Sequence, residues 1–275
     1  MNSIHKTILI FSMISTMVCG ADIVLVVQIT LQISSTEKAI RSHLEQSGHN
    51  VRIVSNKANA DTVAGAACVV ISERIYSGVL GPSLREVPIP VVCMEPWGYQ
   101  HMNMVTDSSH LYYAKTFNQT QVQVVGSDHY LADGLSDTVT VYDSSATINW
   151  GNPNDNAIKI AKNVASSEDS VFDQWSIFAF EKGTVMAYDY PAPARRVAHF
   201  IQDDCEGKIT DDGWKLFDAS VSWCLGYDPV IRGIENASKK RNYHIQLRNE
   251  RGAMRSNATG NIVLFDMCGR YVAAA

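Results

Sequence analysis

The hydrophobic pattern of this chain changes from continuous runs to alternating ones along its length. Residues 23–27 (IVLVV) are all apolar and mostly β-branched, which is typical of a parallel strand buried on both faces. A helix and a second strand at 51–54 follow. Ser34 and Glu37 have the spacing of a helix capping box, and Gly48 favours the left-handed conformation that ends many helices. The sequence therefore begins with a predicted β-α-β unit.

The elements that follow first continue this pattern and then depart from it. Strands expected at 67–72 and 89–94 extend the alternating, doubly wound arrangement. After Trp97, polar and apolar residues alternate at 121–125 and 139–142, as in antiparallel strands with one solvated face. Further strands are expected at 157–161, 176–180, 184–187 and 196–201, and an amphipathic helix at 210–225.

These elements divide the chain into one larger domain and smaller flanking segments. We expect an α/β domain at 22–227, with a flavodoxin-like, mostly parallel sheet, helices on both faces and an antiparallel extension. Residues 1–20 place Lys6 before an apolar stretch that ends in small residues, as signal peptides do. A polar linker is expected at 228–242. A small β tail at 243–275 is too short to fold without a partner sheet.

Composition and charge limit the classes of function. The chain has 275 residues and a net charge of −5, so no basic surface indicates nucleic acid as a partner. After the signal, no apolar run approaches the roughly 20 residues of a membrane-spanning helix. We therefore expect an exported protein without a membrane span in its mature chain, located in the periplasm, at the cell surface or outside the cell.

Six cysteines are present, and Cys19 is expected to leave with the signal peptide. The remaining five show no C-x-x-C spacing, so they do not indicate a disulfide framework. Cys68 and Cys93 lie in apolar runs and are interpreted as small core residues. An alternative is that Cys19 is a lipoprotein cysteine, although Thr16 and Val18 fit that processing pattern poorly.

The order of elements from 22 to 226 resembles the class I glutamine-amidotransferase-like fold and, within it, the trehalose-utilisation-like branch. The matching segments are the βα opening, VVGSDHYLADGLSDTVTVYD at 124–143, and RRVAHFIQDD with DGWKLFDASVSW near the end of the domain. The middle segment is similar to an H-P-L-x-x-G-L turn, with Tyr130 in place of proline. The stretch is also similar to a domain of exported bacterial proteins that often stands beside carbohydrate-active modules, which implies a role near polysaccharide.

The segment GNIVLFDMCGRYV at 260–272 resembles the C-terminal sorting domains of secreted proteins of the Bacteroidetes and Fibrobacter type. Those domains carry an apolar strand followed by Asp-x-x-Gly-Arg, matched here by Asp266, Gly269 and Arg270. The resemblance implies that a type IX-like secretion machinery recognises this tail. The match is partial, because the final strand of those domains has no counterpart here.

A glutamine-amidotransferase nucleophile requires a cysteine on a tight elbow with a glycine two residues to either side. Cys93 has Val91 and Glu95 at those positions, and no G-x-S-x-G serine elbow occurs in the chain. The absence of a nucleophile elbow favours a domain without catalytic activity.

Polar residues after the expected parallel strands are candidates for a ligand site, because ligands bind beyond the carboxyl ends of such strands. These residues are Gln28, Ser72, Glu73, Glu95, Asp203 and Asp204. Candidate catalytic residues are Glu95, His129 and Asp203, with Glu95 and His129 as an acid–base pair or Glu95 and Asp203 as a carboxylate pair. The alternative is that Glu95 caps a neighbouring loop and that Asp203 and Asp204 lie in a solvated turn.

Aromatic residues gather after the fourth expected strand, and they are Trp97, Tyr99, Tyr112 and Tyr113. Exposed aromatic rings stack on sugar rings, so Trp97 and Tyr99 join Gln28 and Glu73 as candidate ligand-binding residues. The alternative is a small core beneath the loop. The histidines are dispersed, so neither a metal site nor a cofactor is expected, although Asp203 with Asp204 is an alternative cation site.

Together these observations favour an exported, non-catalytic accessory or binding domain associated with cell-surface polysaccharide. Its candidate partners are polysaccharide and, through the tail, the secretion machinery. One alternative is a hydrolase acting on a glycan or small ligand at the strand-end crevice. The other is a structural surface protein without a ligand.

Overall fold

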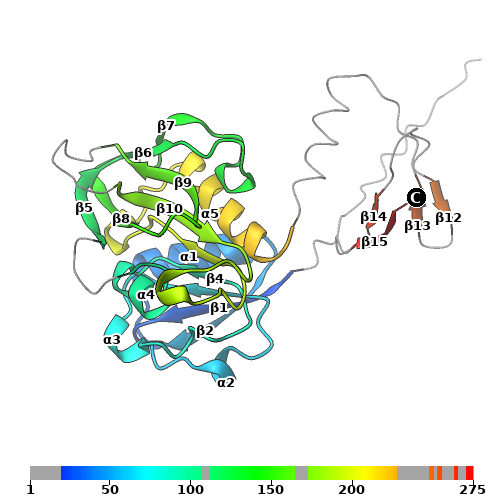
Figure 1. Cartoon of the computed structure of the whole chain (residues 1–275), viewed down its shortest axis with the longest axis horizontal. Helices are drawn as coiled ribbons and strands as arrows, with labels where there is room; N and C mark the ends of the chain where they lie inside the picture. The colour runs from blue at the N-terminus through cyan, green and yellow to red at the C-terminus, as the bar shows by residue number, and fades with distance from the viewer. Residues whose placement is uncertain are drawn as a thin grey trace, which may run out of the picture. The chain divides into compact units, whose positions relative to one another are not determined.

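The computed structural model describes residues 20–106, 112–164 and 173–227, together with four short strands of the tail (Figure 1). The chain has two compact units, of which the larger comprises Gly20–Tyr243. The smaller comprises Met1–Cys19 and His244–Ala275. The described part of the larger unit ends at residue 227, where the division of the chain was expected. The linker expected at 228–242 lies outside the described residues.

Four strands from the first half of the larger unit and one from near its end form the parallel part of an 11-stranded sheet. Its strands are β1 (Asp22–Val27), β2 (Asn50–Ser55), β3 (Cys68–Ile71), β4 (Val91–Cys93) and β11 (Arg196–Ala198). They pair in parallel in the order β2-β1-β3-β4-β11. This is the strand order of flavodoxin-like folds, so the predicted fold class is confirmed.

The second part of the sheet is antiparallel, as expected. It contains β5 (Tyr113–Gln119), β6 (Gln121–Val124), β7 (Asp137–Thr140), β8 (Ala146–Gly151), β9 (Ile158–Asn163) and β10 (Trp175–Phe180). β10 joins this part to β11, and β9, β6 and β7 follow outward, while β8 pairs with β10 and β5. β5 and β8 were not predicted from the sequence.

The prediction of a strand at 184–187 is wrong. Val185 makes only an isolated bridge with Pro191, and the 3-10 turn η2 (Ala187–Asp189) follows. Tyr188 and Asp189 have φ values of 58° and 53°, in the left-handed region that bulky residues seldom adopt. Two consecutive left-handed residues reverse the chain, so an extended strand cannot continue there.

Five α-helices lie among the described residues of this unit. They are α1 (Ser35–Gln46), α2 (Ala60–Val63), α3 (Ser77–Leu80), α4 (Pro96–His101) and α5 (Asp211–Cys224). The predicted capping box of α1 is confirmed, because Ser34 Oγ accepts from Glu37 N at 3.1 Å and Glu37 Oε2 accepts from Ser34 N at 2.7 Å. Gly48 follows α1 with φ at 90°. The predicted helix at 210–225 is confirmed as α5.

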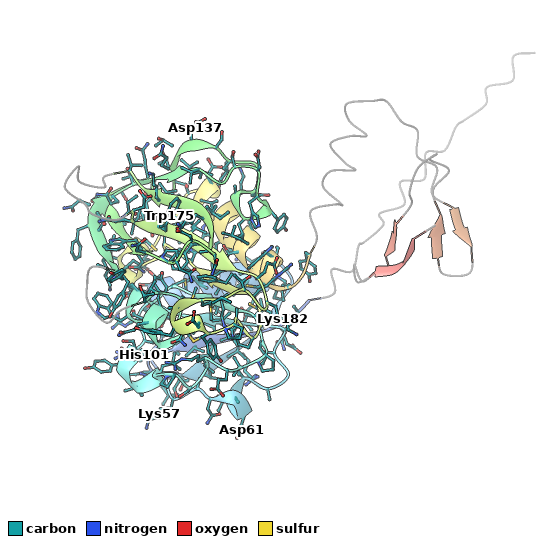
Figure 2. All side chains as sticks on the ribbon, in the orientation of Figure 1. Lys57, Asp61, His101, Asp137, Trp175 and Lys182 are labelled. Atoms are coloured by element: carbon teal, nitrogen blue, oxygen red, sulfur yellow. The ribbon has the colours of Figure 1, made fainter. Side chains whose placement is uncertain are left out.

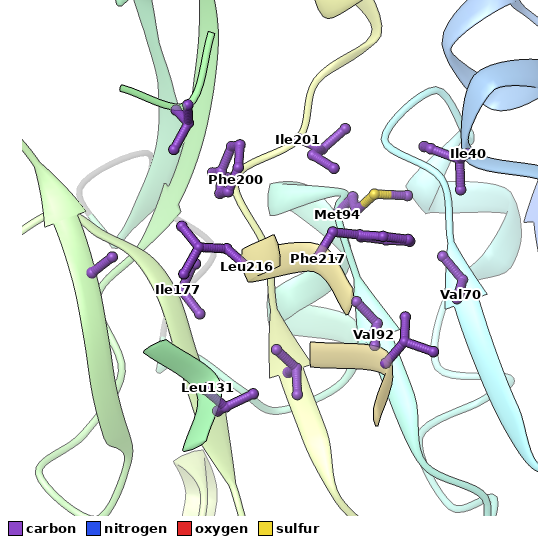
Figure 3. Packing of buried hydrophobic residues seen from close by; sticks show 14 of the residues in the cluster. Ile40, Val70, Val92, Met94, Leu131, Ile177, Phe200, Ile201, Leu216 and Phe217 are labelled. Carbon is purple, nitrogen blue, oxygen red and sulfur yellow. The ribbon is translucent and has the colours of Figure 1, made fainter. Parts of the chain in front are cut away.

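The two faces of the sheet carry separate cores, because alternate residues of each strand point to opposite faces. Ile23, Leu25 and Val27 of β1 pack with residues of α1 and α5. Val24 and Val26 pack on the other side with residues of α2, α3 and α4. Figure 3 shows the first core, including Ile40, Val70, Val92, Leu216 and Phe217. Helices therefore cover both faces.

The outer surface of the parallel half is polar around α2, where Lys57 and Asp61 are exposed (Figure 2). None of the helices in the described ranges is long and apolar enough to cross a membrane.

The tail contains two antiparallel hairpins among its described residues. β12 (Arg248–Glu250) pairs with β13 (Ala253–Arg255), and β14 (Val263–Phe265) pairs with β15 (Tyr271–Ala274). The sorting-motif residues Asp266, Gly269 and Arg270 lie outside the described residues, as does the signal segment up to Cys19.

Candidate functional site

A cleft of about 520 Å³ lies beyond the carboxyl ends of β3 and β4. Its lining comes from the segment after β3, from the start of α4, from β5, and from η3 (Asp203–Cys205), which follows β11. The lining residues are Glu73, Arg74, Ile75, Tyr76, Ser77, Glu95, Trp97, Lys115, Gln202, Asp203 and Asp204. This position is the strand-end crevice expected from the sequence.

Glu73 lines the cleft, and its carboxylate accepts three hydrogen bonds. Its carboxylate accepts from Lys115 Nζ, from Gln202 Nε2 at 2.7 Å and from Asp203 N at 3.1 Å. Burial raises the pKa of Glu73, whose residue is 8% exposed, and the ion pair with Lys115 opposes this rise. The paired cation and the three hydrogen bonds favour the charged form of this carboxylate.

Glu95 is the second buried carboxyl group of the cleft. It precedes α4 as its N-cap, and its Oε1 accepts from Trp97 N at 3.1 Å. Burial, at 4% exposure, and then the charge of Glu73 raise the pKa of Glu95 to about 8, against the opposing effect of Lys115. Glu95 therefore carries a proton at neutral pH. The alternative interpretation made Glu95 the cap of a neighbouring loop, whereas the structure has it capping helix α4. The protonated carboxyl can also donate a hydrogen bond.

Asp203 and Asp204 lie in one short turn, and their two carboxylates have different hydrogen-bond partners. Asp203 Oδ2 accepts from Arg74 Nη1 at 2.7 Å. Asp204 accepts from the backbone and hydroxyl of Thr147 at 3.0 and 2.8 Å. Gln202 links this turn to Glu73, since its Oε1 accepts from Asp204 N and its amide donates to the Glu73 carboxylate. Asp204 therefore holds the turn on β8, and Asp203 faces the cleft with Arg74.

Two aromatic side chains line the cleft. Trp97 is half-buried, with Lys115 Nζ 5.2 Å from its ring centroid and the Tyr113 ring edge-on at 6.1 Å. Tyr76 is 65% exposed and was missed by the sequence analysis. The assignment of Tyr99 to a ligand site is wrong, because this residue is fully buried and donates its hydroxyl to His199 O at 3.2 Å.

His129 lies at the opposite edge of the sheet from Glu95. It caps the 3-10 turn η1 (Tyr130–Ala132), and its ring is 6.1 Å from that of Trp223 at the end of α5. Burial lowers the pKa of His129, and Glu181 and Arg195 are its charged neighbours. Arg195 precedes β11 at its amino end, whereas Glu95 follows β4 at its carboxyl end. The expected Glu95–His129 acid–base pair is therefore wrong.

Gln28 and Cys93 do not contribute to the cleft either. Gln28 follows β1 and is half-buried, but it is not a lining residue. Cys93 is fully buried within β4, and burial raises the pKa of its thiol. The expectation that Cys93 is a core residue agrees with this position. Among the described residues, no group of three or more His, Cys, Asp or Glu side chains is arranged to hold a metal ion.

The fold and the cleft define an α/β domain with a flavodoxin-like parallel half, a protonated carboxyl group and two aromatic rings at its strand-end crevice. No protein-family model matches the chain, and no curated protein matches it. Among solved structures, a candidate GMP synthase subunit protein from Thermoplasma acidophilum has 19% identity and a TM-score of 0.47, covering 78% of this chain and 98% of its own. A candidate ThuA-like protein from Bacteroides uniformis has 9% identity and a TM-score of 0.48, covering 76% and 93%. At this level of similarity, neither assigns a family, activity or ligand to this chain.

Proposed function

We propose that the α/β domain is a non-catalytic binding module that holds a neutral glycan segment of a cell-surface polysaccharide in the strand-end cleft, against Trp97. The observation that carries this proposal is that the Trp97 ring lines an open cleft together with paired carboxylates and the amide of Gln202. Sugars need this combination, because an aromatic face covers their C–H groups and the polar groups bond their hydroxyls.

The charges of the cleft favour a neutral ligand over an anionic one. Both cations that line it are already engaged, Lys115 with Glu73 and Arg74 with Asp203. A carboxylate or sulfate on the ligand would meet these acidic partners as well as the cations, and like charges placed together cost affinity. A ligand rich in hydroxyl groups meets acceptors and donors without that penalty.

Trp97 is held in place before any ligand binds. Lys115 lies over its ring and Tyr113 packs edge-on against it, while its backbone N–H is bonded to Glu95. A side chain that is already ordered loses little conformational entropy on binding. The proposal also places the protein outside the cytoplasm, with the secretion machinery as a second partner, on the support of the signal-like and sorting-like segments.

The binding proposal is tested by retention of the full chain on a panel of immobilised neutral and acidic polysaccharides. Trp97→Ala should weaken retention on the neutral glycan by about tenfold or more, the equivalent of about 1.4 kcal/mol. Phe117→Ala is the matched control, because Phe117 is an aromatic residue with 67% exposure outside the cleft. Equal retention by both variants would overturn the proposal.

Removal of residues 229–275 should reduce export if the tail directs it.

A hydrolase is the second candidate, because a protonated Glu95 at neutral pH has the state of a general acid. Asp203 lines the same cleft and would be the partner carboxylate. Reducing sugar released in the same wells tests this alternative. Release that Glu95→Gln abolishes, with retention intact, would replace the binding module by an enzyme. If the protein is neither retained on any polysaccharide nor releases reducing sugar, a structural surface protein is the best account.

A further inference from the structure

The parallel strands β4 and β11 stop pairing just before they reach the cleft. Their last backbone hydrogen bond among the described residues runs from His199 N to Cys93 O at 2.9 Å. In a continuing parallel ladder, the next bond would run from Ile201 N to Glu95 O. Ile201 N instead donates to the His199 ring, with 3.5 Å to Nδ1. The two strands therefore separate at the level where the cleft begins.

Asn149 of β8 bridges the separated strand ends. Its backbone N–H donates to Phe200 O at 3.0 Å. Its side-chain amide donates to Met94 O at 2.7 Å and to Ile201 O at 2.8 Å, and the side chain is fully buried. Two carbonyls require a group with two N–H donors, which an asparagine amide supplies and a carboxylate does not. One amide group thus joins the segment after β4 to the segment after β11.

Each bridged carbonyl lies one residue before a wall of the cleft. Met94 precedes Glu95, which caps the helix that bears Trp97, and we call these two residues the Glu95 wall. Ile201 precedes the lining residues 202–204, which we call the Gln202 wall. The bridge therefore lies where it can fix the distance between the two walls.

We propose that Asn149 is a positioning residue that sets the separation between the Glu95 wall and the Gln202 wall and thereby the affinity of the cleft for a neutral glycan. The ligand in this role rests on the proposed function, whereas the separation of the walls does not. Thr147, two residues earlier on the same face of β8, supports the role. Its N–H and hydroxyl both donate to the Asp204 carboxylate, so β8 holds the Gln202 wall at two points.

Loss of the amide has two measurable consequences. Buried carbonyls need donors, so water should enter between Met94 O and Ile201 O when the amide is removed. The walls then lie farther apart, and retention of a glycan weakens. The same water lies one residue from Glu95 and solvates it, so ionisation of Glu95 costs less. Glu73 and Lys115, the charged groups that act on Glu95, are not touched by the substitution.

The first test compares Asn149→Ala with Asn163→Ala in the full chain. Asn163 of β9 is a matched control, because it is 1% exposed and its amide also makes two hydrogen bonds, to Thr116 Oγ1 at 2.8 Å and Gln174 Oε1 at 3.0 Å. None of these three control residues lines the cleft. The probe is the neutral polysaccharide of the panel that retains the wild type. Asn149→Ala should weaken retention about tenfold, and Asn163→Ala should change it by less than about twofold. Equal retention by the two variants would contradict the role of Asn149.

The second test needs no ligand. Glu95→Gln is added to each variant, and the resulting change in the urea midpoint is measured at about pH 5 and about pH 9. The pH dependence of this change reports the ionisation of Glu95. It should shrink by about half or more in the Asn149→Ala protein and persist in the Asn163→Ala protein. An undiminished pH dependence would overturn the positioning role. If it shrinks while no polysaccharide retains the wild type, only the proposed function fails.

Hydrogen exchange of the unsubstituted chain decides the matter if Asn149→Ala does not fold. The side-chain amide hydrogens of Asn149 should exchange at least about 100-fold more slowly than those of Asn156. Asn156 is exposed and makes one amide hydrogen bond, to Val185 O at 2.9 Å. Equal exchange rates would show that the bridge between the strand ends is not maintained, and the positioning role would be wrong.

Discussion

Replacement of Glu95 by glutamine tests the electrostatics of the cleft directly. Glutamine has the shape of a protonated glutamate and keeps an amide oxygen that can accept from Trp97 N. The substitution therefore removes the ability to ionise while it preserves the hydrogen bond that caps α4. Any difference between the two proteins that depends on pH then reports the titration of Glu95 and of the groups coupled to it.

The sign and size of the effect follow from proton binding. Burial and the charge of Glu73 raise the pKa of Glu95 to about 8 in the folded protein. The contribution of the protonated carboxyl is fully present below the unfolded pKa of about 4.3 and is lost as the pH rises through about 8. Within that window the free energy of unfolding of the wild type should fall relative to E95Q by about 1.4 kcal/mol per pH unit. The total is about 5 kcal/mol.

Urea unfolding of both proteins at intervals between about pH 5 and pH 9 measures this difference. E95Q should lie close to the wild type at the acidic end and become several kcal/mol more stable at the alkaline end. Glu86→Gln controls for the loss of one carboxylate, because Glu86 lies at the surface. A difference that stays constant over the whole range would refute the reasoning, since Glu95 would then ionise alike in the folded and unfolded chains.

Three further substitutions test other parts of the structure. Lys115→Met leaves the buried carboxylate of Glu73 without its cation, so it should cost about 3 kcal/mol in urea unfolding at neutral pH; an unchanged midpoint would contradict the ion pair. Tyr99→Phe removes the hydrogen bond to His199 and should cost about 1 kcal/mol, with glycan retention unchanged because the residue is buried. Arg196→Met should cost about 3–5 kcal/mol, because the fully buried guanidinium donates to four backbone carbonyls; a loss below 1 kcal/mol in the same assay would count against that network.

The parts of the fold that the sequence predicted carry local signals. The apolar run of β1 lies between β2 and β3 in the parallel part of the sheet and needs no partner residue to be recognised. The capping box of Ser34 and Glu37 is likewise contained in one helical turn. β5 carries no such signal, because its residues YAKTFNQ are mostly polar and half-buried or exposed. The strand that bears Lys115 therefore could not be predicted from the local pattern.

The misassignment of Tyr99 has a geometric cause. From the sequence, Trp97 and Tyr99 were expected in one loop, where both could face a ligand. The structure has helix α4 there, with Glu95 as N-cap and Pro96 in its first turn. Residues two apart in a helix point about 200° apart around its axis. Trp97 consequently reaches the cleft, while Tyr99 packs edge-on against Phe178 in the core.

The antiparallel extension affects the protonation of the two buried carboxyl groups in the cleft. The ends of β3 and β4, which are adjacent strands, bring Glu73 and Glu95 to the same site, and each charge disfavours the other. Lys115 arrives from β5 and binds Glu73 directly, whereas its effect on Glu95 is smaller than that of burial and of Glu73. Lys115 therefore opposes the rise in the pKa of Glu73 directly, whereas the pKa of Glu95 stays raised to about 8. Lys115 is carried by β5, so the opposition to the rise in the pKa of Glu73 depends on a strand from the antiparallel half of the sheet.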